Sequence, residues 1–168
     1  ADLTAMLREG EAYFKLIALG DGLYAFYADR QGQKGYRLGL TTRQLDTAVN
    51  ALRDTIALTI NGQTNTYPFD VELGRKTYLD LFAPVYDGLV ATKHLIFEPD
   101  GPMLKLPVNL LVAGQAGVDA YLKRIAGPNG DEFDFTGIEW LGRGRAISTT
   151  ISARAIADAR SPRRSSAP

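Results

Sequence analysis

Residues 95–111 constrain the fold more than any other part of the chain. A short apolar run at residues 94–97 is bounded by turn residues, which predicts a buried strand. Pro99-Asp100-Gly101 then predicts a tight turn. A short return leads to Pro107, whose fixed φ suits the first turn of a helix. The segment therefore predicts a buried strand, a turn, a short return and a proline-started helix, an unusual order.

The chain has 168 residues, which is near the common size of one domain. A domain of about 150 residues buries roughly 68–70% of its unfolded surface, so we expect one compact unit. The sequence contains no cysteine, which excludes disulfides, thiolate metal sites and cysteine nucleophiles within these residues. No apolar run approaches the roughly 18–20 residues that span a bilayer, and no secretion signal is visible. We therefore expect a cytoplasmic protein that does not cross a membrane.

The charge balance argues against a nucleic-acid partner. The chain carries 19 basic and 19 acidic residues, but Arg160, Arg163 and Arg164 lie in the last nine residues. Without these three arginines, residues 1–159 are acidic overall, and such a surface does not attract phosphate backbones. Residues 160–168 have no apolar side chain larger than alanine or proline, so we expect a disordered basic linker. Residues 1–159 form the predicted domain.

The amino-terminal part predicts an antiparallel meander. Residues 11–19 and 23–28 have strand composition, and Gly20-Asp21-Gly22 between them indicates a hairpin turn. A polar loop follows, and residues 36–40 supply a third strand. The aromatic side chains of the first two strands are expected to pack this meander between helices: Tyr13, Phe14, Tyr24, Phe26 and Tyr27.

Two helices follow the meander. Thr41 or Thr42 can cap the first, whose apolar positions recur at spacings of three, four and seven: Leu45, Ala48, Val49, Leu52 and Ile56. Asp70 starts the second, and Pro84 is expected to open a new turn, so that a two-part helix ends near Gly88.

The rest of the chain predicts shorter elements. After the proline-started helix with Leu110 and Leu111, residues 119–124 predict one more helical turn. Residues 127–137 are rich in Gly, Pro, Asn and acids and predict an exposed loop. Residues 145–151 read as a strand, and Ser152 as the cap of a last helix bearing Ala155, Ile156 and Ala159. Together these elements predict an α/β fold, with a mixed sheet, an amino-terminal antiparallel meander and flanking helices.

The candidate nucleophiles and bases are few. His94 is the only histidine, so base-assisted chemistry would have to use it. Ser148 and Ser152 are its conceivable partners, but neither lies in a Gly-x-Ser-x-Gly setting, and Ser152 is better explained as a helix cap. Asp100, between proline and glycine, is expected to bond nearby backbone amides. We interpret His94 as a structural or surface residue.

Two charged clusters are best interpreted as loops rather than as binding sites. Asp131, Glu132 and Asp134 fail the calcium-loop spacing and read as a solvated loop. Gly142-Arg143-Gly144-Arg145 lacks the spacing of a phosphate loop, and we interpret it as a loop before a strand that can meet a carboxylate from a partner. We expect no catalytic, cofactor-binding or metal-binding residue in this chain.

Four motifs along the chain resemble motifs of CHAT domains and occur in the same order as in that family. CHAT domains are caspase- and separase-like peptidases that are often attached to tetratricopeptide repeats. The best match is Pro99-Asp100-Gly101 with Leu104 and Leu106-Pro107. No single motif is diagnostic, but the ordered set is similar to the family over nearly the whole chain. The other three are Glu11-Ala12-Tyr13 before a hairpin, Tyr78-Leu79 with Leu81 and Pro84, and Trp140-Leu141 followed by Ala146-Ile147-Ser148 and Ser152.

The resemblance implies a caspase/separase-like, pseudo-caspase half domain from a bacterial protein. The family's His-Gly and Cys strands would come after this segment, so the chain corresponds to the non-catalytic half that positions substrate for a cysteine endopeptidase. Implied partners are the missing carboxy-terminal catalytic half, an upstream tetratricopeptide-repeat region and a protein substrate. The alternative is a non-enzymatic protein-interaction scaffold. In both cases we expect the chain alone to lack peptidase activity, to expose a strand edge at residues 94–97 or 145–151, and to self-associate or bind its downstream half through that edge.

Overall fold

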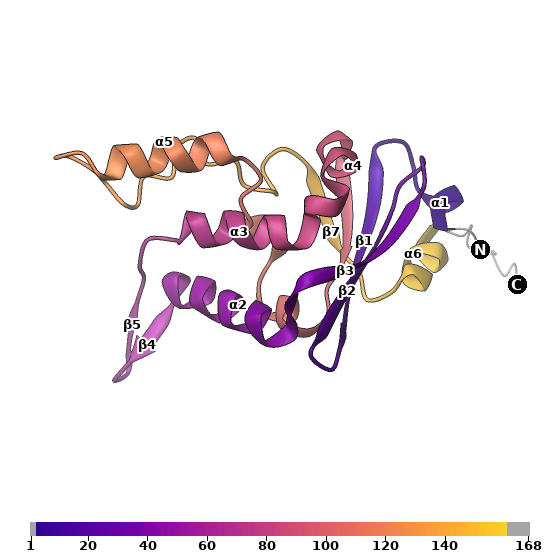
Figure 1. The fold of residues 1–168 in the computed structure, drawn as a ribbon, viewed down its shortest axis with the longest axis horizontal. Helices are drawn as coiled ribbons and strands as arrows, with labels where there is room; N and C mark the ends of the chain where they lie inside the picture. Colours follow the sequence, from indigo (N-terminus) through magenta and orange to yellow (C-terminus); the bar gives the residue numbers. More distant parts are fainter. Residues whose placement is uncertain (1–2, 161–168) are drawn as a thin grey trace, which may run out of the picture.

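The computed structural model describes residues 3–160 as an α/β fold around one mixed sheet (Figure 1). β1 and β2 pair antiparallel, as do β2 and β3, whereas β6 is parallel to β1 and β7 is parallel to β6. The predicted meander and mixed sheet are therefore confirmed. The strands, in sheet order, are β3 Gln33–Thr41, β2 Gly22–Ala28, β1 Glu11–Leu19, β6 His94–Glu98 and β7 Ala146–Thr149.

One face of the sheet carries the main core. Figure 1 shows α2 (Thr42–Ile56) and α3 (Val71–Phe82) side by side on this face. Thr41 caps α2 in a capping box, since its side chain accepts from the Gln44 N–H while the Gln44 side chain accepts from the Thr41 N–H. Asp70 caps α3 by accepting from the Leu73 N–H at 2.9 Å. Both predicted helix starts are confirmed.

The two-part helix at Pro84 is also present. A 3-10 turn, η1 (Ala83–Val85), takes the proline in its first turn, and α4 (Tyr86–Ala91) follows. Proline suits this position because the first N–H groups of a helix have no partner inside the helix. α4 continues three residues past Gly88, the predicted end.

The opposite face of the sheet is covered by α1 (Leu3–Met6) and α6 (Ala153–Arg160), which lie together beside the chain ends in Figure 1. Ser152 caps α6, as predicted, because its hydroxyl accepts from the Ala155 N–H at 3.1 Å. Ile156 of α6 packs in a small apolar cluster with Tyr13 and Ile96 of the sheet. This face therefore has its own thin core.

Arg160 lies at the end of α6, although we expected it at the start of the linker. Its guanidinium donates to the Met6 carbonyl at 2.7 Å and forms an ion pair with Glu11 at 2.8 Å. The arginine therefore joins α6 to the amino-terminal end of the domain. The remainder of the predicted linker, residues 161–168, lies outside the described residues.

Several elements differ from the sequence-based expectation. The segment after Gly101, expected as a short return, forms the 3-10 helix η2 (Gly101–Lys105), and the proline-started helix is the 3-10 turn η3 (Val108–Leu110). α5 extends over Gln115–Ile125, where one turn was expected. A small exposed hairpin, β4 (Leu58–Ile60) and β5 (Gln63–Asn65), was not predicted. In the described part of the chain, no helix is long and apolar enough to span a membrane.

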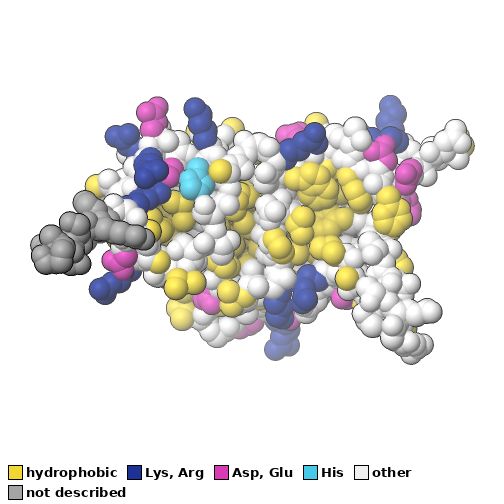
Figure 2. All heavy atoms as spheres, turned by 180° about the vertical axis from the view of Figure 1, so that it is seen from behind, with side chains coloured by type: hydrophobic (Ala, Val, Ile, Leu, Met, Phe, Trp, Pro, Cys, Tyr) yellow, Lys and Arg dark blue, Asp and Glu magenta, His cyan; other side chains and the backbone are white. Residues whose placement is uncertain are grey.

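α5 and the hairpin project from the same end of the molecule. Figure 2 shows hydrophobic side chains gathered between these two projections on the rear face. A row of aromatic contacts ties the loop after α5 to the segment before α3: Tyr121 stacks on Phe135, Phe135 meets Trp140 and Trp140 meets Phe69. These contacts hold the loop at residues 127–137, although most of its residues are exposed as predicted.

Candidate functional site

β7 forms an edge of the sheet, and within residues 3–160 no strand lies on its outer side. The Ala146 N–H donates to Lys93 and the Thr150 N–H to Phe97, each at 2.9 Å, so the even-numbered residues of β7 bond to β6. In a parallel strand the intervening residues direct their N–H and C=O groups the other way. Ile147 and Thr149 therefore present backbone donors and acceptors at an open edge.

β6, the other strand for which we expected exposure, lies between β1 and β7 and is almost entirely buried. Of these two strands, only β7 lies at an edge of the sheet. Ala146, Ser148 and Thr149 are exposed, and the Ile151 side chain beyond them is 90% exposed. An exposed edge that ends in a large aliphatic side chain is a pairing site unless something covers it.

The flanks of β7 are basic. No acidic residue lies between Glu139 and Asp158, whereas Arg143, Arg145 and Arg154 all fall in this stretch. Arg154 forms a helical ion pair with Asp158. The other two line a cavity of about 310 Å³ at the start of β7, which also contains Glu139 and the Trp140 side chain.

The two arginines of this cavity have different roles. Arg145 donates through Nη1 to the Leu89 carbonyl, which ties the start of β7 to α4. Its Nε is buried and has no hydrogen-bond partner among the described residues. Arg143 is exposed. Because Arg143 is exposed and charged, its guanidinium is available to an incoming carboxylate.

A row of hydrogen bonds crosses the sheet beside this edge, on the face covered by α1 and α6. Glu11, His94 and Ala146 are register partners on three parallel strands, and Ser148 lies two residues along β7 on the same face. His94 Nε2 lies 2.8 Å from the Ser148 hydroxyl oxygen. His94 Nδ1 lies 3.2 Å from Glu11 Oε1. The structure thus brings His94 and Ser148 together, whereas Ser152 caps α6.

Glu11 is the most strongly bonded member of this row. Burial alone would raise the pKa of its carboxyl, but bonds from Arg160, the Arg8 N–H and His94, with the charge of Arg160, lower that pKa below its ordinary value. The Arg8 N–H donates to Oε2 at 2.8 Å, Arg160 Nη2 donates to Oε1 at 2.8 Å, and Arg160 Nη1 forms an ion pair with Oε2. Glu11 therefore stays ionised and fixes both His94 and α6.

This arrangement predicts acid sensitivity at Glu11. A group whose folded pKa is lowered stabilises the fold fully above its unfolded pKa, here about 4.5, and loses that contribution as the pH falls through its folded pKa. We expect the difference in unfolding free energy between the wild type and Glu11→Gln to be constant near neutral pH and to shrink below about pH 4.5. Urea unfolding at a series of pH values measures it. A difference that persists unchanged to about pH 2 contradicts the role assigned to Glu11.

A second polar cluster lies further along the same face. The Tyr13 hydroxyl donates to Glu98 Oε2, and Lys15 donates to the other Glu98 oxygen at 2.6 Å. Burial, reinforced by the Glu98 carboxylate, raises the pKa of Tyr13 far above its ordinary value. These groups satisfy one another, so we assign the cluster a structural role.

The other singled-out acids bond to backbone amides. Asp100 accepts from the Gly101 N–H at 2.8 Å and from the Ala18 N–H at 2.9 Å, which confirms the predicted turn role and adds a link to β1. In the exposed loop, Asp131 accepts from the Phe133 N–H and Asp134 from the Thr136 N–H. Within the described residues no cluster of His, Cys, Asp or Glu has a metal-binding arrangement.

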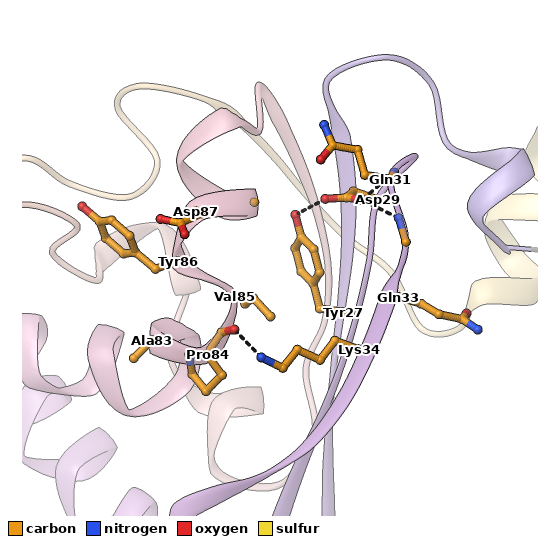
Figure 3. A pocket seen from close by; sticks show the side chains of 12 residues that line it. Tyr27, Asp29, Gln31, Gln33, Lys34, Ala83, Pro84, Val85, Tyr86 and Asp87 are labelled. Atoms are coloured by element: carbon orange, nitrogen blue, oxygen red, sulfur yellow. Dashed lines mark hydrogen bonds between the residues drawn. The ribbon is translucent and has the colours of Figure 1, made fainter.

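A cavity of about 350 Å³ lies between the β2–β3 turn and η1 (Figure 3). Three of its polar side chains are bonded: Tyr27 donates to Asp29 at 3.0 Å, and Lys34 donates to the Pro84 carbonyl at 2.9 Å. Asp29 also accepts from two backbone amides of its own turn. Burial, with Asp29 nearby, raises the pKa of Tyr27 to about 12. Since the Lys34 bond joins β3 to η1, we interpret this cavity as part of the contact between these elements rather than as a functional site.

Sequence reasoning named Ser148 as a conceivable partner of His94 but set the pair aside, and it did not connect Glu11 to them. The histidine is separated from its partners by 83 and 54 positions along the chain. The available signal was that all three sit in predicted strands, but their register depends on which strands are neighbours and in which direction they run. Comparison of the chain with known protein families, with curated proteins and with solved structures finds no match.

Proposed function

We propose that residues 1–159 act as the non-catalytic half of a CHAT-type cysteine peptidase domain, whose His- and Cys-bearing half completes the sheet across β7. The open β7 edge carries this proposal: a mixed sheet that ends in an exposed parallel strand with free backbone groups is a sheet with room for another strand. The absence of cysteine is consistent with a division of labour in which the nucleophile comes from the other half.

The flanking charges specify the incoming strand. Arg143 and Arg145 line a cavity at the start of the edge, together with the acidic residue Glu139, and Arg143 is exposed. An extended segment that pairs with Ile147 and Thr149 and places a carboxylate near Arg143 would satisfy both the strand edge and the arginines. We therefore propose an acidic strand of the downstream half as the occupant.

The first test reads the gene beyond codon 168. A His-Gly pair at the end of one strand and a cysteine at the end of another are expected for the peptidase. A downstream sequence without them overturns the peptidase assignment and leaves the alternative, a protein-interaction scaffold that uses the same edge. In that case the chain should form concentration-dependent oligomers by light scattering.

The second test measures binding between separately expressed halves by calorimetry. Thr149→Pro removes an outward N–H, which an edge strand tolerates, but it deletes one bond to an incoming strand and obstructs pairing. We expect binding to weaken by about tenfold, because the lost hydrogen bond contributes roughly 1 kcal/mol, the obstructed pairing adds to this loss, and tenfold corresponds to 1.4 kcal/mol. Thr149→Val, which keeps the N–H and the shape, should bind within a few-fold of the wild type. Equal binding by the proline and valine variants would show that β7 is not the interface.

A further inference from the structure

The row of Glu11, His94 and Ser148 has the connectivity of a nucleophile, a base and an orienting acid. With hydrogen on Nδ1, the imidazole donates to Glu11 Oε1 at 3.2 Å. Its Nε2 is then free to accept from the Ser148 hydroxyl, whose oxygen lies 2.8 Å away. A nucleophile within hydrogen-bond reach of a base, which a third group orients, is the arrangement that activates a serine.

Glu11 is held firmly enough to fix the tautomer of His94. The Arg160 guanidinium and the Arg8 N–H bond to its carboxylate, and only 7% of the Glu11 residue is exposed. The His94 side chain is 30% exposed and Ser148 lies on the surface, so a small molecule can reach the hydroxyl. Contacts within the protein thus hold Glu11 and His94 in place, while the Ser148 hydroxyl is accessible to solvent.

The open edge supplies a donor for the negative charge that develops on a carbonyl under attack. The N–H of Thr149, the residue after Ser148, points away from β6 and pairs with no described strand. His94 occupies the β6 side of Ser148, so a reagent approaches from the side on which this N–H lies. A single backbone donor of this kind contributes about 10²–10³-fold to the rate in acyl-transfer sites.

We propose that Ser148 is a reactive nucleophile that accepts the acyl group of small activated esters, with His94 as its base and Glu11 as a positioning residue. The Ser148 oxygen bonds to the carbonyl carbon and its proton passes to His94 Nε2. The ester C–O bond then breaks, and the leaving aryl alcohol takes up that proton. Attack by water on the acyl-serine returns the free serine and a carboxylic acid. No described cavity is lined by Ser148, so the substrate class is restricted to small acyl groups with a good leaving group.

The proposal is tested by labelling the isolated chain with a fluorophosphonate. In the labelling reaction the Ser148 oxygen bonds to phosphorus, fluoride leaves, and the serine proton passes through His94 to solvent. We expect one adduct, mapped to Ser148 by peptide mass spectrometry. His94→Gln should slow its formation by about 10²-fold or more, the usual contribution of a general base. Thr149→Pro should slow it as well, and Glu11→Gln should fall between the wild type and His94→Gln.

Controls separate chemistry from folding. Thr64→Ala removes an exposed hydroxyl far from the row and should label at the wild-type rate, whereas Ser148→Ala should not label. Glu11→Asp, which keeps the carboxylate, should label faster than Glu11→Gln if Glu11 positions His94. The proposal is overturned by absence of an adduct, by an adduct elsewhere, or by equal rates in the wild type and the folded His94→Gln variant. Binding between the two halves is a separate readout, so its failure and this failure are distinguishable.

Discussion

Replacing Phe14 with alanine should lower the free energy of unfolding by about 3–5 kcal/mol. Phe14 is fully buried at the centre of β1. Its ring meets Phe82 of α3 at 4.6 Å and Phe97 of β6 at 5.8 Å between centroids. Truncation removes contacts with the neighbouring strand and with the covering helix at once, and the surrounding core can relax only partly. A loss of this size is a large part of the stability of a typical domain.

Urea unfolding followed by circular dichroism measures this loss. Phe133→Ala is the matched control, because that ring lies in the loop after α5 and is 54% exposed. It should cost less than about 1 kcal/mol. If the two alanine variants unfold at the same urea concentration, the aromatic cluster around Phe14 does not carry the stability assigned to it.

Asp100→Ala should cost about 3 kcal/mol, because hydrogen bonds to a charged group contribute roughly 1.5–3 kcal/mol each. One carboxylate oxygen of Asp100 accepts from Gly101, which has a left-handed φ of 54°, and the other accepts from Ala18 near the end of β1. The side chain therefore fixes the turn and joins the ends of two parallel strands. Asp100→Asn keeps one acceptor oxygen and should lose about half as much.

Asp87→Ala provides the comparison for Asp100, since Asp87 is an exposed acid in the first turn of α4. Its removal should change the unfolding free energy by less than about 1 kcal/mol, the usual contribution of a charge at a helix start. Chemical denaturation near neutral pH measures all three variants. Equal effects of the alanine changes at positions 87 and 100 would contradict the joining role of Asp100.

Sequence patterns predicted the elements that are specified locally. Leu45, Val49 and Leu52 recur at helical spacing and are fully buried in α2, and the cap residues at Thr41, Asp70 and Ser152 bond as expected. These features depend on residues only three or four positions apart, so a pattern can reveal them.

The features that sequence patterns missed depend on tertiary contacts or on marginal local signals. α5 starts at Gly114 without a side-chain cap, and its first turn lacks acidic residues, so its beginning carried no signal. Its position instead depends on Gly117, where an added Cβ would lie 2.4 Å from the Gly137 carbonyl oxygen. The β4–β5 hairpin is an exception, because it turns at Asn61-Gly62, both with positive φ, and this pair is a strong hairpin signal that the sequence analysis overlooked. Its two strands are mostly exposed and too short for an alternating pattern.

The bond between Arg160 and Met6 has a consequence for how such a unit joins other domains. It holds the first and last described helices against each other on one side of the sheet, away from α2 and α3 (Figure 1). A unit whose entry and exit points are adjacent can be inserted into a surface loop of a host protein without stretching either chain. Fusion partners attached at both ends would crowd the α1 and α6 side and leave the α2 and α3 side clear. The fold is thus suited to insertion as a domain within a larger protein.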